Sequence, residues 1–286
     1  MRSKLLVLAS LLILSSMVLS ACQPSATPTP EVIIQTQIVE GQPQEVVVTA
    51  TPSADQPAAA APYLRVNLGT YPDTIDPQKS SFVNEIAHLK LIYEGLTRLD
   101  NDLNTVPGAA ESWEYNDDAT QLTFHLREGL KYSDGSLLNA KRFEYSLMRN
   151  IDPATAGEYA SITDDIAGAA DWRTADVTAL SEEELAALRD AVQVHAVDST
   201  GAACTDYEQT DCLDLVIGLA QPAPYFHTVA SLWVTYPAKE ELISEGGEIW
   251  WNSSKFQVGN GPFVLSALEP FVRAYFTPNA NYWRGV

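Results

Sequence analysis

Catalytic and metal-binding signatures are scarce in this chain of 286 residues. The four histidines are scattered, and His88 and His227 have no cysteine or acidic residue at metal-ligand spacing. The sequence has no Gly-x-Ser-x-Gly nucleophile elbow, no phosphate-binding glycine loop and no His-Glu-x-x-His motif. Adjacent acids such as Asp117 and Asp118 are typical of turns. We therefore expect neither enzymatic activity nor a bound metal or cofactor.

Positive charge is also scarce. The chain has 17 Lys and Arg against 37 Asp and Glu, which gives a formal net charge of −20. Such a surface repels phosphate backbones, so the composition argues against nucleic-acid binding. Acidity of this kind most often reflects solubility, and a preference for cationic ligands is a weaker inference.

The N-terminal apolar run is too short to span a membrane. It extends over 15 residues from Leu5 to Leu19, whereas a spanning helix needs roughly 20. Because basic residues precede it, we interpret 1–21 as a signal peptide. The segment Leu19-Ser20-Ala21-Cys22 resembles the lipobox of bacterial lipoproteins, which implies a lipidated Cys22 and an exported protein anchored on the outer face of the cytoplasmic membrane. The alternative is secretory cleavage after Ala21 that leaves an unmodified cysteine.

Residues 22–62 contain no Lys, Arg, Trp, Phe or Tyr and are rich in Pro, Thr, Ala and Gln. This composition predicts a flexible tether, because little apolar surface is available to offset the cost of ordering. The β-branched runs 32–34 and 46–48 could pair as short strands or bind a partner. Pro43 and Pro52 nearby favour disorder instead.

The remaining 224 residues, 63–286, are enough for a sizeable core. Alternation of apolar and polar residues predicts strands at 64–68 and 121–127 and a strand pair at 192–196 and 213–219. Spacing of three to four residues predicts helices at 86–96 and after Asn139, and Ser181 with three following glutamates predicts another helix start. A hairpin turn is expected at 116–118. These elements indicate an α/β fold.

Cys204 and Cys212 lie between the two runs of the predicted strand pair. In an exported protein such a pair favours a local disulfide. Metal binding is the alternative, although two cysteines without a nearby histidine make a poor zinc site.

A series of short motifs, in order along the chain, resembles solute-binding protein family 5, the dipeptide, oligopeptide and nickel receptors of ABC importers. The motifs are Tyr93-Glu94-Gly95-Leu96, Ala110-Glu111-Ser112-Trp113-Glu114, Phe124-His125-Leu126-Arg127-Glu128-Gly129, Tyr132-Ser133-Asp134-Gly135, the helix from Asn139 to Arg149, Pro222-Ala223-Pro224-Tyr225-Phe226, Asn260-Gly261-Pro262-Phe263 and Asn279-Ala280-Asn281-Tyr282-Trp283.

The resemblance implies the first lobe of a two-lobed clamp of the type II periplasmic-binding-protein kind. Residues 63–95 and 191–286 would form its α/β part, and 96–190 an inserted α+β subdomain. We expect the second lobe to be absent from this sequence, so that the resemblance covers roughly the first half of a receptor.

The resemblance also suggests ligand contacts. Ser81, Phe82 and Val83 would line the cleft and offer backbone partners to a bound strand, and Tyr159 matches a tyrosine that reaches the ligand. Asn260 and Gly261 match a loop that faces the same cleft. The alternatives are a packed aromatic residue at Tyr159 and a simple turn at Asn260 and Gly261.

The partners implied are a peptide ligand and the permease subunits of an ABC importer, with the membrane reached through Cys22. We expect the protein to act as a monomer. Alternatives are a receptor of the same fold for a nickel chelate, an opine or an oligosaccharide, or a remnant lipoprotein that binds no solute.

Overall fold

A computed structural model describes residues 32–39, 42–49 and 63–285. The chain divides into two compact units, Met1–Arg65 and Val66–Val286, which are treated separately. The predicted signal peptide and Cys22 lie outside the described residues.

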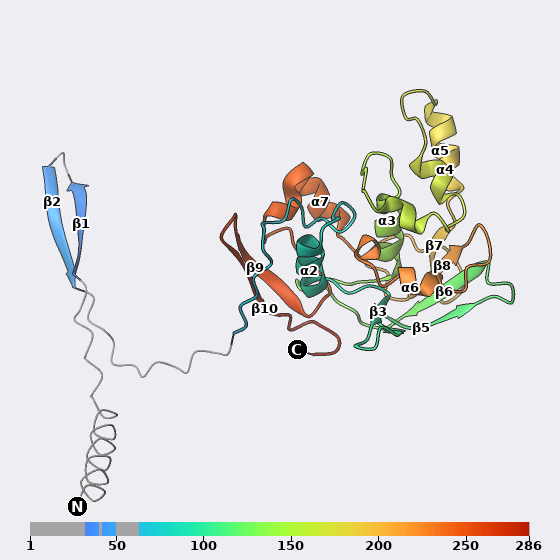
Figure 1. Ribbon diagram of the computed structural model, residues 1–286, viewed down its shortest axis with the longest axis horizontal. Helices are drawn as coiled ribbons and strands as arrows, with labels where there is room; N and C mark the ends of the chain where they lie inside the picture. The colour runs from blue at the N-terminus through green and yellow to red at the C-terminus, as the bar shows by residue number, and fades with distance from the viewer. Residues whose placement is uncertain (1–31, 40–41, 50–62, 286) are drawn as a thin grey trace, which may run out of the picture. The chain divides into compact units, whose positions relative to one another are not determined.

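The first unit contains a β-hairpin of strands β1 (Val32–Val39) and β2 (Gln42–Thr49). The strands are antiparallel, with Val32 opposite Thr49 and Val39 opposite Gln42 (Figure 1). The alternative in which these β-branched runs pair as short strands is therefore the one that the structure describes. β-Branched residues favour strands, and Pro43 is tolerated because each strand of a two-stranded sheet has one side outside the ladder.

The second unit is built around a four-stranded antiparallel sheet of order β5-β6-β8-β7. Its strands are β5 (Ala110–Tyr115), β6 (Gln121–Leu126), β7 (Val194–Val197) and β8 (Asp214–Gly218). The hairpin predicted around residues 116–118 is confirmed, and so is the pairing of the later two runs.

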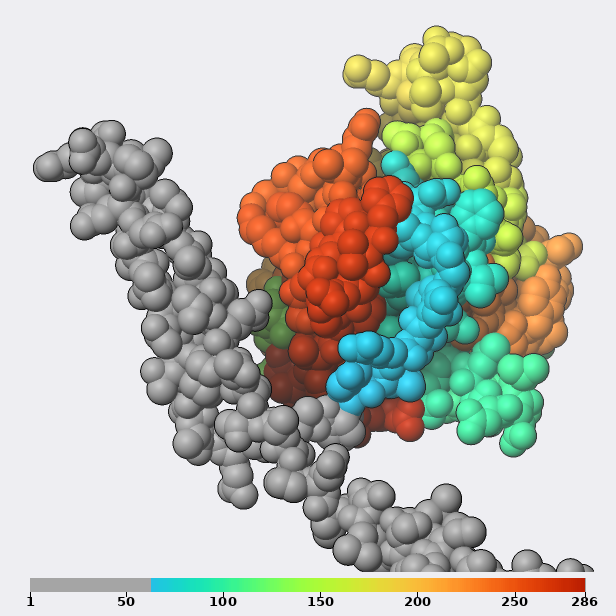
Figure 2. Space-filling view, turned by 60° about the vertical axis from the view of Figure 1, so that its left-hand side comes forward, coloured from blue at the N-terminus to red at the C-terminus, as the bar shows by residue number. Residues whose placement is uncertain are grey.

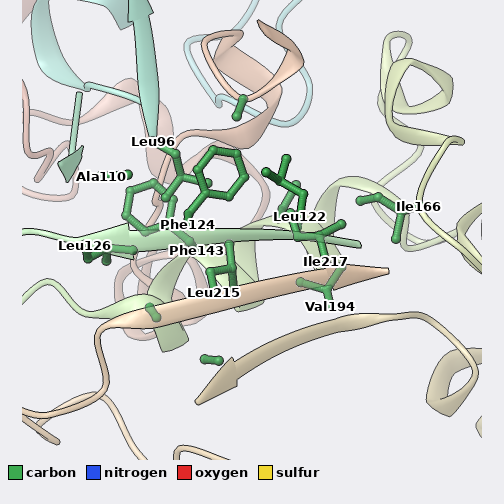
Figure 3. Packing of buried hydrophobic residues seen from close by; sticks show 14 of the residues in the cluster. Leu96, Ala110, Leu122, Phe124, Leu126, Phe143, Ile166, Val194, Leu215 and Ile217 are labelled. Carbon is green, nitrogen blue, oxygen red and sulfur yellow. The ribbon is translucent and has the colours of Figure 1, made fainter. Parts of the chain in front are cut away.

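One face of this sheet is buried beneath helix α3 (Ala140–Asn150). Leu122 and Phe124 of β6, Leu215 and Ile217 of β8 and Phe143 of α3 all belong to one core cluster (Figure 3). The apolar alternation of β6 and the apolar stripe of α3 therefore meet, and burial of these side chains is the main stabilising contribution.

The other elements surround the sheet and a second core. They are α2 (Val83–Ile92), β3 (Thr97–Leu99), β4 (Thr105–Pro107), η2 (Ala160–Thr163), α4 (Ala169–Arg173), α5 (Glu182–Asp190), α6 (Phe226–Val229), η3 (Trp233–Thr235), α7 (Glu240–Gly246), η4 (Gly247–Asn252), β9 (Phe263–Glu269) and β10 (Arg273–Pro278). The second core unites Ile75, Leu89, Ile92, Tyr93, Tyr236 and Leu265. Figure 2 shows the blue and cyan start of this unit beside the red β9–β10 hairpin, where the rings of Tyr71 and Phe271 are 4.6 Å apart.

The strand predicted at 64–68 is wrong. These residues have no strand partner among the described residues, and Leu64 is 87% exposed. Alternation alone does not make a strand, because the backbone groups also need a neighbouring strand.

Two predicted helix starts are present, but only one has a side-chain cap. Ser181 and Glu184 form the reciprocal capping bonds expected for α5. Asn139 occupies the N-cap position of α3, yet its amide donates to the carbonyl groups of Asp206 and Gln209 instead. Asn139 therefore ties α3 to the β7–β8 connection.

The predicted subdomain boundary at residue 191 crosses a continuous sheet. Strand β6, from the predicted insert, pairs with β8, from the predicted α/β part. In the β7–β8 connection, a disulfide joins the buried Cys204 and Cys212, whose Cα atoms are 5.8 Å apart.

Candidate ligand-binding surface

Glu85 organises the loop that precedes helix α2. Its Oε1 accepts hydrogen bonds from the backbone N–H groups of Asp73 (3.1 Å) and Thr74 (3.2 Å). Its Oε2 accepts from Ser81 (2.7 Å) and Phe82 (3.0 Å). The carboxylate is buried and lies in the first turn of α2, where the helix dipole favours an acid. One side chain thus draws residues 73–82 into a closed loop.

A buried ion pair fastens the same loop to α3. The Arg149 guanidinium donates to both oxygens of Asp76, at 2.7 and 2.6 Å, and Trp250 Nε1 donates to Asp76 at 3.0 Å. Burial opposes the charged form of Arg149, but the hydrogen bonds and charge of Asp76 raise the pKa of Arg149 above its usual value. The two charges therefore satisfy each other inside the protein.

Gln78 connects this ion pair to η3 and the residue that follows it. Its Oε1 accepts from Arg149 at 2.7 Å, and its Nε2 donates to the carbonyl groups of Val234 and Tyr236, each at 3.1 Å. Gly157 packs directly on Gln78, because a Cβ at position 157 would lie 2.1 Å from the Gln78 carbonyl oxygen. The loop that carries Tyr159 is therefore held beside the loop at 76–82.

Trp233 links the two loops. Its Nε1 donates to the carbonyl of Ser80 at 2.7 Å, and its ring meets the Tyr159 ring edge-to-face, with centroids 5.2 Å apart. Ser81 is half-buried, whereas Phe82, Val83 and Tyr159 are 55%, 85% and 42% exposed. We call Ser81, Phe82, Val83, Tyr159 and Trp233 the loop surface.

The loop surface offers fewer backbone donors than the sequence suggested. The N–H groups of Ser81 and Phe82 are both bound to Glu85, so they cannot pair with a ligand strand. Val83 and Asn84 begin α2, and N–H groups in a first helical turn have no intrahelical acceptor. Contacts by exposed side chains therefore dominate what this surface can offer.

Asn260 and Gly261 have a packing role instead. The Asn260 side chain is buried, its Oδ1 accepts from the N–H of Glu94 at 3.0 Å, and its Nδ2 donates to the Glu94 carbonyl at 2.9 Å. Gly261 donates to the carbonyl of Ile92 at 2.7 Å, and a Cβ there would lie 2.6 Å from the Ile92 carbonyl carbon. These two residues hold the chain at the end of α2 by hydrogen bonds and close packing. We do not include them in the loop surface.

Glu94 lies at the centre of a second buried group that sequence reasoning missed. Tyr282 O–H and Trp283 Nε1 both donate to its carboxylate. Burial raises the pKa of Glu94, while the bonds from Tyr282 and Trp283 oppose that rise. Both partners belong to motifs noted in the sequence, but nothing in the spacing of those motifs indicated that they meet.

Within residues 32–39, 42–49 and 63–285, no group of three or more His, Cys, Asp and Glu side chains could hold a metal ion. None of the helices described in those ranges combines the length and apolar character needed to cross a membrane.

The geometry can be compared with known proteins. Residues 104–286 match the middle part of the bacterial extracellular solute-binding proteins, family 5. The chain belongs to this family. It is 32% identical over 213 residues to the probable deoxycholate-binding periplasmic protein YgiS of Escherichia coli, covering 74% of this chain and 36% of that protein. It is 30% identical over 218 residues to the periplasmic oligopeptide-binding protein OppA of the same organism. This match covers 76% of this chain and 36% of that protein.

Solved structures of family members share the fold. An oligopeptide ABC transporter substrate-binding domain from Bacillus anthracis gives a TM-score of 0.63 at 30% identity, covering 75% of this chain and 37% of that one. Haemophilus influenzae OppA in complex with RPPGFSPFR gives a TM-score of 0.62 at 26% identity. The match covers 76% of this chain and 38% of that one. The α/β fold predicted from the resemblance is thus confirmed, and this chain spans about 36% of the length of the curated relatives cited above.

Proposed function

We propose that this chain forms the first lobe of an exported receptor that captures peptides and delivers them to an ABC importer, without catalysis. Family membership supports the role of solute receptor. Relatives named oligopeptide-binding proteins, and the solved relative in complex with the peptide RPPGFSPFR, support peptides as the solute. Anchoring through a lipid on Cys22 is part of the same proposal and rests on the lipobox-like sequence.

The loop surface is the observation that carries the proposal for these residues. Phe82, Val83 and Tyr159 remain exposed, although the loops beneath them are fixed by Glu85 and by the buried Asp76–Arg149 pair. Exposed apolar side chains on a rigid support are typical of a binding surface. Because the surface offers apolar side chains more than directed backbone bonds, it suits ligands that carry apolar side chains of their own.

A nuclear magnetic resonance titration of the isotope-labelled chain with RPPGFSPFR tests this proposal. We expect saturable shifts of the amide signals of Val83, Asn84 and Tyr159. The variant Val83→Ser should weaken the shifts, while Val177→Ser, at another exposed valine, should leave them unchanged. Shifts spread over the whole chain, or equal loss in both variants, would contradict a ligand site at the loop surface.

An amphipathic steroid is the second candidate ligand, because one relative at 32% identity is named a probable deoxycholate-binding protein. Aromatic and aliphatic side chains such as those of Phe82 and Val83 could also pack against a steroid face. The same titration with deoxycholate below its micelle concentration separates the two. Saturable shifts with deoxycholate and none with peptide would replace the proposed ligand class.

A further inference from the structure

The β1–β2 hairpin has two outer strand edges. Among the described residues, β1 and β2 pair only with each other. A two-stranded ribbon is marginally stable in water, and an unpaired strand edge is a template for another strand. A further strand that paired with the hairpin would therefore stabilise it. The edges of β1 and β2 differ in how well they can pair with such a strand.

The sequence of β1 is nearly the same read in either direction from Thr36. Gln35 and Gln37 flank it, followed by Ile34 and Ile38. The next positions, 33 and 39, are isoleucine and valine, both β-branched. An antiparallel copy of β1 centred on Thr36 would therefore set like residues opposite one another, and matched cross-strand pairs are what stabilise a sheet. This symmetry points to a second copy of the same chain.

The edge of β2 is less suitable. Pro43 has no backbone N–H to donate, and Glu45 would stand opposite another Glu45 in antiparallel pairing centred there. Strand β1 has neither proline nor charge. Natural proteins use prolines and charges to block strand edges, so the unblocked edge is that of β1.

We propose that two copies of this chain associate through antiparallel pairing of their β1 strands about Thr36. The product is a four-stranded sheet of order β2-β1-β1-β2 with a two-fold axis at Thr36. A two-fold interface uses the same patch on both copies and is closed, so it forms dimers rather than fibres. This differs from the monomer expected from sequence and is independent of the ligand.

Disulfide trapping tests the register. In the full chain carrying Cys22→Ser, one added cysteine is placed at Thr36, at Val32 or at Gln44, while the native pair Cys204–Cys212 is already bonded. Directly opposed residues have Cα atoms about 4.5 to 5.5 Å apart, within disulfide range. The two copies of Val32 would be eight positions apart, about 26 Å.

We expect Thr36→Cys to form cross-linked dimers faster than Val32→Cys or Gln44→Cys, by about tenfold, because pairing raises the local thiol concentration. Equal rates at all three sites would show random encounters and overturn the proposal. Equally fast linkage at Thr36 and Val32 would show parallel pairing and would also overturn it.

Sedimentation of uncross-linked protein provides the second measurement. Ile34 and Val47 stand opposite each other in the hairpin, so Ile34→Lys and Val47→Lys disturb the same internal pair. Only Ile34→Lys places a charge on the β1 edge. We expect the Cys22→Ser chain and its Val47→Lys variant to dimerise with rising concentration and Ile34→Lys to stay monomeric. A monomeric Cys22→Ser chain at every concentration, or equal behaviour of both lysine variants, would refute the pairing.

Discussion

Trp233 donates a hydrogen bond from its indole Nε1 to the carbonyl oxygen of Ser80 at 2.7 Å, across 153 residues of sequence. The same ring supports Tyr159 from a third segment. One partly buried hydrogen bond and one aromatic contact thus bring together the two loops that the family resemblance associates with ligand. An indole N–H that reaches a carbonyl also removes the cost of burying both groups.

Glu85→Gln should loosen the loop at 73–82. A glutamine retains one acceptor oxygen and turns the other into an amide donor, which faces backbone N–H groups such as those of Ser81 and Phe82. We expect a loss of about 2 to 4 kcal/mol in the free energy of unfolding, measured by urea denaturation. Glu182→Gln, at an exposed position in the first turn of α5, is the control and should change stability by less than about 0.5 kcal/mol. Equal effects in the two variants would contradict the role assigned to Glu85.

Local sequence signals predicted the local structure. The β5–β6 hairpin follows from alternation and its turn residues, and α5 begins at its capping box. The role of Glu85 was not predicted, because an acid in a first helical turn is common. No sequence pattern indicates that four backbone N–H groups will donate to its carboxylate.

The pairing of β6 with β8 was not predicted. The alternation in β6 does not indicate that Gln121 will pair with Gly218 of β8, and the same kind of alternation at 64–68 forms no strand. The loop surface was reached only through the resemblance. Ligand contact by Phe82, Val83 and Tyr159 stays a prediction, whereas Asn260 shows that a motif position can be buried and bonded to the neighbouring backbone.

Glu94 should make stability depend on pH. Burial raises its pKa above 4.5 in the folded protein, so the folded state binds the proton more tightly than the unfolded state. The associated stability is present below pH 4.5 and is lost as pH rises through the folded pKa. We expect Glu94→Gln to lack this pH-dependent loss of stability, because glutamine does not titrate. The difference between the unfolding free energies of wild type and variant should therefore change between pH 4.5 and the folded pKa, and level off above that pKa. A difference that is constant with pH would contradict the pKa direction.

Removal of the Cys204–Cys212 disulfide should weaken the fold without abolishing it. The bridge closes a short loop with a sequence separation of 8. The chain-entropy relation gives about 2.5 kcal/mol for such a loop. We expect the double variant Cys204→Ala, Cys212→Ala to melt at a lower temperature and keep its circular dichroism spectrum. Mass spectrometry after alkylation without reductant checks the bond, and two labelled thiols in the native protein would exclude it.

Cys22→Ser should release the protein from the membrane. If Cys22 carries lipid, its acyl chains hold the protein at the bilayer, and each buried methylene contributes about 0.8 kcal/mol. Fractionation of cells that express the full chain or the variant measures this directly. Identical membrane fractions would contradict the lipid anchor, and a mass increase on the wild-type N-terminal peptide provides independent support.

A polypeptide of these 286 residues alone should bind peptide weakly. Ligand sites usually enclose most of their ligand, whereas a single surface formed by Phe82, Val83 and Tyr159 leaves much of a peptide in water. The charged ends of a peptide also need fixed partners, but the carboxylate of Asp76 and the guanidinium of Arg149 beneath this surface already neutralise each other. We expect a Kd weaker than about 10 μM by calorimetry with RPPGFSPFR and with a mixture of short peptides. Submicromolar binding would show that the loop surface, with the residues around it, is a complete peptide site.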